Sequence, residues 1–218
     1  MSEDYFLKEK SVKLLQQLRN VFYQSPGIKE FFYKENEVLM KNLTPDSVVL
    51  DVGCGFGTHV VMLSKYCKEV FGIDHSEAIL KKCRKNVEGI RNVKILKMNA
   101  YQMDFPDNHF DETFSLFNTL GIMHKPIEAL REMKRVTKKG GRLVFSLYNP
   151  NSIEERIEFY KKAALDDAHA EGLVIKSGSD FFSNTYTEKE VQALGKEIDM
   201  EIIIHETKIG HICEAVKK

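Results

Sequence analysis

The chain has 218 residues, enough for one domain with a sizeable hydrophobic core. Basic and acidic residues number 32 each, so the formal net charge is zero, which argues against a nucleic-acid backbone as the main partner. The cysteines have neither zinc-ligand nor paired-redox spacing, so we expect no metal site and buried thiols in a reducing compartment. They are Cys54, Cys67, Cys83 and Cys213.

The first residues do not have the pattern of a targeting segment. Residues 1–4 contain two acidic residues, and no apolar run of signal-peptide type follows them. No stretch of the sequence approaches the length of apolar residues that a membrane-spanning helix needs. We therefore expect no membrane segment and a cytoplasmic location.

Residues 5–42 show two apolar stripes with helical spacing, separated by Ser-Pro-Gly at 25–27. We expect residues 1–42 to form a helical cap that packs on the edge of a sheet or closes over a ligand. Three polar aromatic residues of this segment could face such a ligand: Tyr5, Tyr23 and Tyr33.

Residues 48–52 are an apolar, β-branched run, as is typical of a buried parallel strand. Glycines at positions 53, 55 and 57 follow, and then a helical segment over residues 59–66. Strand, glycine loop and helix together bring backbone N–H groups against a nucleotide-like ligand. Thr58 stands where the dinucleotide fingerprint has its third glycine, which disfavours a nicotinamide cofactor. A tight turn without a ligand is the alternative.

Two acidic residues accompany this loop. Asp51 lies two positions before the first glycine, and Asp74 ends a second apolar run over residues 70–73. An acidic residue about 20 positions after the glycines, at the tip of the next strand, can accept hydrogen bonds from ribose hydroxyls. Ser76 is the expected N-cap of a helix that ends near Val87.

Residues 50–57, Leu-Asp-Val-Gly-Cys-Gly-Phe-Gly, and 70–76, Val-Phe-Gly-Ile-Asp-His-Ser, resemble two motifs of the class I methyltransferases that use S-adenosylmethionine. The resemblance extends over about residues 43–148. It implies a doubly wound α/β fold whose mostly parallel seven-stranded sheet ends in an antiparallel strand. It also implies S-adenosylmethionine as the cofactor. The expected cofactor-binding residues are Asp51, Gly53, Cys54, Gly55, Asp74, His75, Asn99, Ala100, Phe117 and Asn118.

The next two strands are expected over residues 93–98 and 112–117. By the resemblance, Asn99 and Ala100 would hold the adenine, although the family often has an acidic residue in place of Asn99. A carboxamide oxygen can still accept from the adenine amino group. Ligands of doubly wound sheets bind beyond the carboxyl ends of the strands, which places Phe117 and Asn118 near the cofactor. A turn residue that bonds its own backbone is an equally good interpretation of Asn118.

Pro126 starts a helix that residues 138–141, Lys-Lys-Gly-Gly, are expected to end, and residues 142–148 form the fifth strand. Residues 151–182 interrupt the pattern with one helix and then a loop over 172–180. We expect this insertion to lie over the ligand as a lid, with a plain surface insertion as the alternative.

A capping box at residues 187–190 begins the next helix. Residues 200–205 and 211–216 are then expected to close the sheet as an antiparallel pair. The cofactor-binding domain is thus expected to comprise residues 43–218.

Methyl transfer from a sulfonium donor is a direct displacement, so the protein mainly aligns the reactants, and a base is needed only for a protonated acceptor. His124 and Tyr148 are the expected catalytic residues, with His59 and His75 as further candidates. We expect a small-molecule acceptor. Methylation of RNA, such as a tRNA base, is the runner-up, and a non-catalytic cofactor-binding subunit is a third alternative. The sequence leaves the oligomeric state open.

Overall fold

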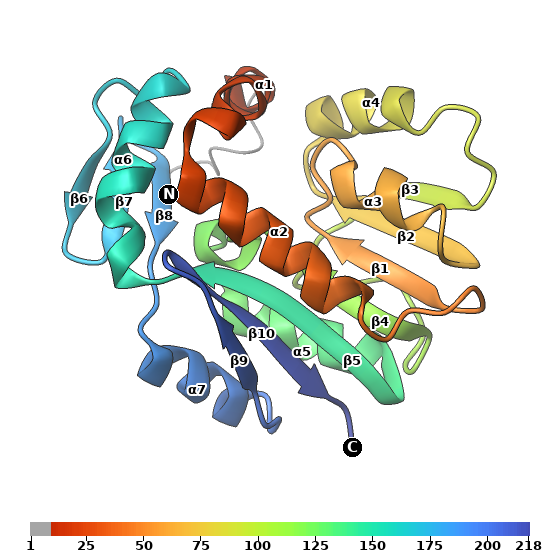
Figure 1. The fold of residues 1–218 in the computed structure, drawn as a ribbon. Coiled ribbons are helices and arrows are strands. Elements are labelled where there is room, and N and C mark those ends of the chain that lie inside the picture. The colour runs from red at the N-terminus through yellow and green to blue at the C-terminus, as the bar shows by residue number, and fades with distance from the viewer. Residues whose placement is uncertain (1–9) are drawn as a thin grey trace.

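The structure, a computed structural model, describes residues 10–218 around a seven-stranded sheet with strand order β3-β2-β1-β4-β5-β10-β9 (Figure 1). Neighbouring strands among β1 to β5 are parallel, and β10 is antiparallel to both β5 and β9. The predicted α/β fold with an antiparallel last strand is therefore confirmed. The strands are β1 (Val48–Val52), β2 (Glu69–Asp74), β3 (Val93–Lys97), β4 (Phe110–Ser115), β5 (Thr137–Tyr148), β9 (Ile203–Glu206) and β10 (Gly210–Val216).

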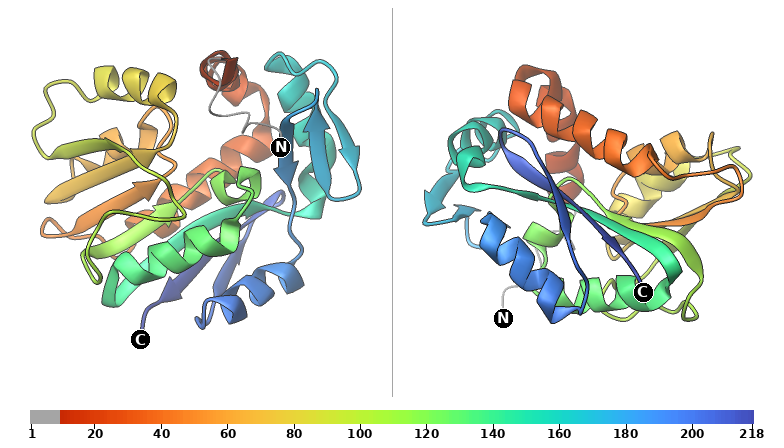
Figure 2. Two further views of the ribbon diagram at one scale, coloured as in Figure 1. Left: turned by 180° about the vertical axis from the view of Figure 1, so that it is seen from behind. Right: turned by 60° about the horizontal axis from the view of Figure 1, so that its bottom comes forward.

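Helices cover both faces of the sheet, as Figures 1 and 2 show. One face packs against apolar side chains of α2, α3 and α4, and the other against those of α5 and α7. The helical segments are α1 (Lys10–Val21), η2 (Phe22–Gln24), α2 (Pro26–Met40), α3 (Thr58–Leu63), α4 (Glu77–Asn86), η3 (Thr119–Ile122), α5 (Pro126–Val136), η4 (Pro150–Ser152), α6 (Ile153–Lys162) and α7 (Glu188–Glu197).

The N-terminal helices break where the sequence predicted, because Pro26 occupies the first turn of α2. α2 packs directly on the sheet: the guanidinium of Arg142 on β5 donates to Val38 O and Leu39 O at the end of this helix. The same guanidinium forms buried ion pairs with Glu112 and Glu214. α2 thus shares one hydrophobic core with the sheet. A separate helical cap over residues 1–42 stays a prediction.

Several strand boundaries differ from the sequence prediction, and two of the differences have a clear structural reason. β5 begins at Thr137, so Lys138 and Lys139 are strand residues and do not end a helix. β4 ends at Ser115, because Phe117 and the residue after it adopt left-handed backbone angles that a strand cannot contain.

The insertion contains a small sheet where the sequence predicted a loop over residues 172–180. Its strands, β6 (His169–Glu171), β7 (Val174–Ser177) and β8 (Phe181–Asn184), are antiparallel. Buried and half-buried residues alternate along β7 and β8, whereas Gly172 and Gly178 turn the chain with positive φ angles. Because these strands are only three to four residues long, the glycines between them made the segment look like a loop in the sequence.

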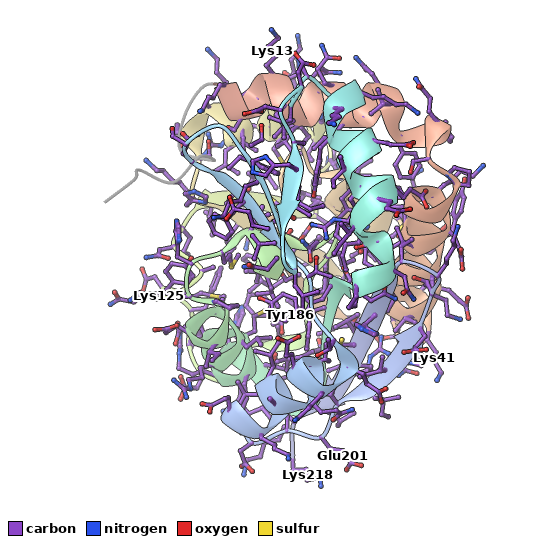
Figure 3. The ribbon with its side chains drawn as sticks, turned by 90° about the vertical axis from the view of Figure 1, so that its left-hand side faces the viewer. Lys13, Lys41, Lys125, Tyr186, Glu201 and Lys218 are labelled. Carbon is purple, nitrogen blue, oxygen red and sulfur yellow. The ribbon has the colours of Figure 1, made fainter. Side chains whose placement is uncertain are left out.

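The insertion is joined to the main sheet at its two ends. It leaves β5 through η4 and returns through Tyr186, which lies at the middle of the face shown in Figure 3. The Tyr186 N–H donates to Tyr148 O at 2.8 Å, and Tyr186 O lies 3.1 Å from the ring nitrogen Nε2 of His211. These contacts place α6 and the small sheet beside the carboxyl ends of the strands.

Candidate active site

A cavity of about 830 Å³ lies at the carboxyl ends of the strands, between the sheet, α1 and the insertion. Its size is that of a small-molecule site. One part, here called the polar end, is lined by Asp51, Gly53, Cys54, Gly55, Asp74, His75, Asn99 and Ala100. The other part, here called the aromatic end, is lined by Leu15, Leu18, Arg19, Phe22, Phe32, Phe117, Tyr148, Phe159, Tyr160 and Phe181.

The glycine loop between β1 and α3 forms the floor of the polar end. Gly53, Gly55 and Gly57 all have positive φ angles, which side chains other than glycine rarely adopt. A Cβ on Gly57 would lie 2.8 Å from the sulfur of Cys83, so this glycine is needed for packing. A Cβ on Gly55 would meet no protein atom within 4 Å and would project into open space.

Two buried carboxyl groups face the polar end. Oδ2 of Asp51 has no hydrogen-bond partner within residues 10–218, and burial raises the pKa of this group well above its usual value. Asp74 accepts from Ser76 N at 2.9 Å and from Gly55 N at 3.2 Å, and burial raises its pKa too. A buried acceptor without a partner is costly unless a ligand supplies the donor, so Asp51 fits an ammonium or hydroxyl group.

His75 and Asn99 complete the polar end. The His75 ring nitrogen Nδ1 lies 3.6 Å from Asp74 Oδ1, so the imidazole lies beside the carboxylate at the tip of β2. The side-chain oxygen of Asn99 accepts from Tyr101 N at 2.9 Å. This bond orders the turn after β3 and leaves the amide of Asn99 for a ligand.

The turn after β4 is strained and is held from two sides. Phe117 and Asn118 both have positive φ angles, 56° and 60°. The Asn118 amide donates to Ser183 Oγ at 3.0 Å and its oxygen accepts from Tyr148 N at 3.1 Å. Asn118 thus fastens β8 to the end of β5, and although it lines the cavity, its carboxamide is committed to protein groups.

Sequence reasoning missed Glu35, which lies on the buried side of α2 and holds the other residue of this turn. Oε1 of its carboxyl group accepts from Phe117 N at 2.6 Å and from the Ser146 hydroxyl, and burial raises its pKa to about 8. Oε2 of Glu35 has no partner within the described chain. The signal in the sequence is its position on the inward stripe of α2, between Phe31 and Leu39.

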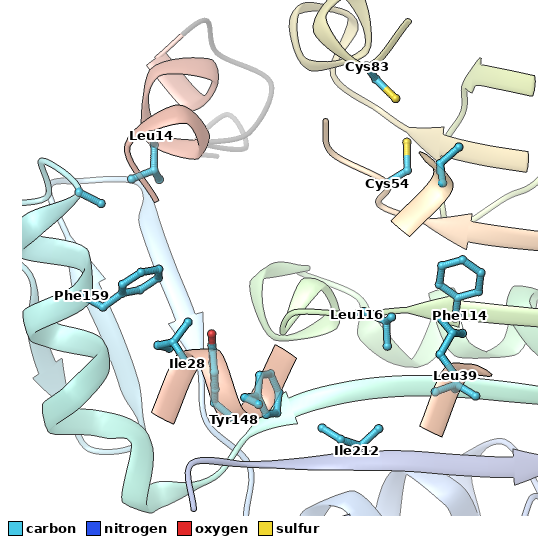
Figure 4. Close-up of a cluster of buried hydrophobic side chains, with 14 of the residues drawn as sticks. Leu14, Ile28, Leu39, Cys54, Cys83, Phe114, Leu116, Tyr148, Phe159 and Ile212 are labelled. Atoms are coloured by element: carbon cyan, nitrogen blue, oxygen red, sulfur yellow. The ribbon is translucent and has the colours of Figure 1, made fainter. Parts of the chain in front are cut away.

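The two predicted catalytic residues occupy different surroundings. His124 is exposed, its ring packs 4.8 Å from the ring of Phe182, and it does not line the cavity. We therefore do not retain it as a base. Tyr148 does line the cavity, and its oxygen points away from the sheet (Figure 4). Burial raises the pKa of Tyr148 well above its usual value, so the group is a neutral phenol.

His59 is the histidine that reaches the cavity from the first turn of α3. Its ring lies 5.4 Å from that of Phe32, and Nε2 has no partner within residues 10–218. Burial lowers its pKa to about 4, so the imidazole is neutral near pH 7. It can exchange hydrogen bonds with a ligand but carries no charge there.

Aromatic rings from distant parts of the chain form the aromatic end. Phe22 follows α1, Phe32 lies on α2, Phe117 follows β4, and Tyr160 lies on α6. Of the tyrosines considered from the sequence, Tyr23 lines the cavity mouth, Tyr33 is exposed elsewhere, and Tyr5 lies outside the described residues.

Residues 10–218 contain neither a cluster of metal ligands nor a membrane-spanning helix. No group of three or more metal-ligating side chains is present there. None of the helices in that range is long and apolar enough to cross a membrane.

The segment that contains the glycine loop is similar to known protein families. Residues 50–145 match the family described as a methyltransferase domain. Demethylmenaquinone methyltransferase of Geobacillus kaustophilus is 36% identical over 119 residues, which are 51% of this chain and 50% of that protein. Phosphatidylethanolamine N-methyltransferase of Cereibacter sphaeroides is 38% identical over 99 residues, 44% and 48% of the two chains. The chain thus spans about half the length of these relatives.

The fold comparison extends over nearly the whole chain. A SAM-dependent methyltransferase from Aquifex aeolicus superposes with a TM-score of 0.67 and 23% identity, over 97% of this chain and 99% of that one. The matched segment contains the end of β1, the glycine loop and the carboxylate of Asp74, which are features that line the polar end. Residues 50–145 therefore match a methyltransferase domain, and the chain shares its fold with a SAM-dependent methyltransferase.

Proposed function

We propose that the protein transfers a methyl group from S-adenosylmethionine to a small molecule with a large apolar part. One observation carries the proposal: a single cavity joins the polar end, with its family motifs, to an end walled by aromatic side chains. The polar end suits the cofactor and the aromatic end suits the acceptor. A shared cavity is what transfer requires, because both reactants must meet with water excluded.

The residues of the polar end fit the cofactor. Asp51 would face the ammonium of the methionyl part with its unpartnered oxygen. Asp74 would exchange its bonds to the loop for bonds to the ribose hydroxyls, and Asn99 with Ala100 would border the adenine. Gly55 leaves the space that lets the ligand approach the backbone.

When bound, S-adenosylmethionine supplies an activated methyl group whose leaving group is a neutral thioether. The chain's own residues then have to orient the acceptor and keep water out. Phe32 and Phe117 close the aromatic end beside His59, whose neutral ring can hold a hydrogen bond to the acceptor. Neither His59 nor Tyr148 is a strong base near pH 7, so we assign both to positioning.

The proposal is tested in two steps. Calorimetry should show binding of S-adenosylmethionine and of S-adenosylhomocysteine, with one site per chain. Transfer of labelled methyl to metabolite extracts and to tRNA then separates the three alternatives. Labelled small molecules support the proposal, labelled tRNA supports RNA methylation, and binding without any transfer supports a non-catalytic subunit. A protein that binds neither compound would contradict all three.

A further inference from the structure

The aromatic end of the cavity has an unusual charge balance. Asp51 and Asp74 lie at the polar end, and none of the described residues that line the aromatic end is a carboxylate. Its one charged lining residue is Arg19 on α1, which is exposed and makes no ion pair within residues 10–218. Among residues 10–218, the mouth of this end therefore has a positive charge and no lining counter-charge.

A second arginine lies behind the aromatic wall. Arg156 on α6 is fully buried, yet it makes no ion pair within the described chain. Its guanidinium donates to neutral groups: Ser152 Oγ at 3.2 Å, Thr185 Oγ1 at 2.9 Å, and both oxygens of Ser183. Its Nε has no partner there. A buried cation without a counter-ion is costly, so its presence calls for a function.

The charge of Arg156 is separated from the cavity by single aromatic rings. Its guanidinium carbon lies 4.2 Å from the centre of the Tyr148 ring and 5.7 Å from that of Tyr160, and both rings line the cavity. Phe31 stacks on Tyr148 at 4.8 Å, which fixes the phenol in place. The Tyr148 hydroxyl makes no hydrogen bond within the described chain and points away from the sheet (Figure 4). It is thus a donor that no described residue uses, on a ring that lies against the Arg156 guanidinium.

We propose that the aromatic end binds an acceptor with a flat apolar body and a negatively charged group, such as a carboxylate or phenolate. The Tyr148 hydroxyl donates to that group, Arg156 acts through Tyr148 as a positioning residue, and Arg19 attracts the anion at the mouth. An ammonium group in the same place would face two cations that form no ion pair within residues 10–218, in a medium of low dielectric constant. Where the anionic oxygen is itself the atom that takes the methyl group, no base is needed, which fits the neutral state of His59.

This inference rests on the proposed function, and a set of matched probes tests it. Naphthalene-2-carboxylate, its primary amide and 2-naphthylmethylammonium share one ring system and differ in charge. Their binding is measured by calorimetry with S-adenosylhomocysteine present at saturation, after the binding of that compound alone has been measured. We expect the carboxylate to bind at least about tenfold more tightly than the amide, and the ammonium compound to bind most weakly.

Variants assign this preference to the named residues. Tyr148→Phe and Arg19→Gln should each weaken binding of the carboxylate about three- to tenfold and leave binding of the amide unchanged. Arg156→Gln should make the affinities for the carboxylate and the amide equal. Arg156→Lys should keep the preference for the carboxylate. Lys13→Gln removes an outward-pointing cation of α1 and serves as the control for Arg19→Gln (Figure 3).

Three outcomes would overturn the inference. The first is equal affinity of the wild-type protein for all three probes, and the second is tighter binding of the ammonium compound. The third is an unchanged carboxylate-to-amide ratio in both Tyr148→Phe and Arg19→Gln, which do not depend on the folding of an Arg156 variant. Loss of S-adenosylhomocysteine binding would instead contradict the proposed function, so the two failures are distinguishable.

Discussion

The two ends of the cavity are built in different ways. The polar end comes from β1, the glycine loop, β2 and the turn after β3, which follow one another in the sequence. The aromatic end gathers side chains from α1, α2, the turn after β4, the end of β5, and the insertion. A site made from consecutive segments can be recognised from a motif. A site assembled by tertiary contacts leaves only scattered aromatic residues in the sequence.

The comparison is also one of charge. The polar end offers carboxyl groups to a ligand with an ammonium and ribose hydroxyls, and the aromatic end offers phenol and guanidinium groups. One cavity can therefore hold two different ligands, because each end disfavours binding of the ligand that suits the other end.

The largest expected effect is at Gly55. Gly55→Val should weaken cofactor binding more than 100-fold, because the new side chain projects into the ligand's space. The fold should survive with a loss of about 1–2 kcal/mol from the positive φ angle. Gly89→Val is a matched control, since Gly89 also has a positive φ angle and open space but lies outside the cavity. Calorimetry and thermal unfolding measure both variants, and normal binding by Gly55→Val would place the ligand elsewhere.

Glu35 connects α2 to the strained turn between the two ends, and it predicts a pH dependence. In the unfolded chain its carboxyl has a pKa near 4.5, and in the folded protein the pKa is about 8. Between these values the native state holds a proton that the unfolded state lacks, so stability falls as the pH rises. From pH 6 to pH 9 the loss at this group is roughly 2.5 kcal/mol.

Glu35→Gln should remove that part of the pH dependence. Glu112, whose pKa burial raises to about 7, makes stability fall in the same direction, so the measured quantity is the difference between variant and wild type. Denaturant unfolding at pH 6 and pH 9 gives this difference. Parallel pH profiles of the two proteins would show that Glu35 does not titrate in this window.

Asp74→Ala tests the carboxylate at the tip of β2. We expect cofactor affinity to fall by about 2 kcal/mol, because charge-assisted hydrogen bonds to the ribose are lost. Asp46→Ala removes an exposed carboxylate at the opposite end of β1 and controls for the change in charge. Calorimetry that finds Asp74→Ala as tight as Asp46→Ala would remove Asp74 from the site.

The smallest effect is expected at His124. His124→Ala should change the rate of methyl transfer less than about twofold, because the ring packs on Phe182 outside the cavity. His59→Ala is the matched variant inside the cavity and should lower the rate more. A larger loss in His124→Ala than in His59→Ala would mean that the aromatic end extends to His124.

Sequence patterns predicted the main sheet well because its elements are defined locally. Ser76 caps α4 through its hydroxyl, and Thr187 with Glu190 forms the predicted capping box of α7. The early start of β5 was not predictable from Lys138 and Lys139, because Gly140 and Gly141 pair with Lys217 near the chain's end. The small sheet of the insertion was missed for a related reason. Each of its short strands is stabilised by hydrogen bonds to a neighbouring strand and has no pattern of its own in the sequence.

The sequence by itself determined the β1 strand, the glycine loop and the acidic residues that follow it. These features act through backbone angles and spacing within one continuous segment, so they are visible without a fold. Only the tertiary structure decided the places of Glu35, Asn118 and Arg156. Each of them forms its contacts with residues far away in the chain, and burial then changes its ionisation or uses its hydrogen bonds. Such effects depend on what surrounds a side chain, which no local pattern encodes.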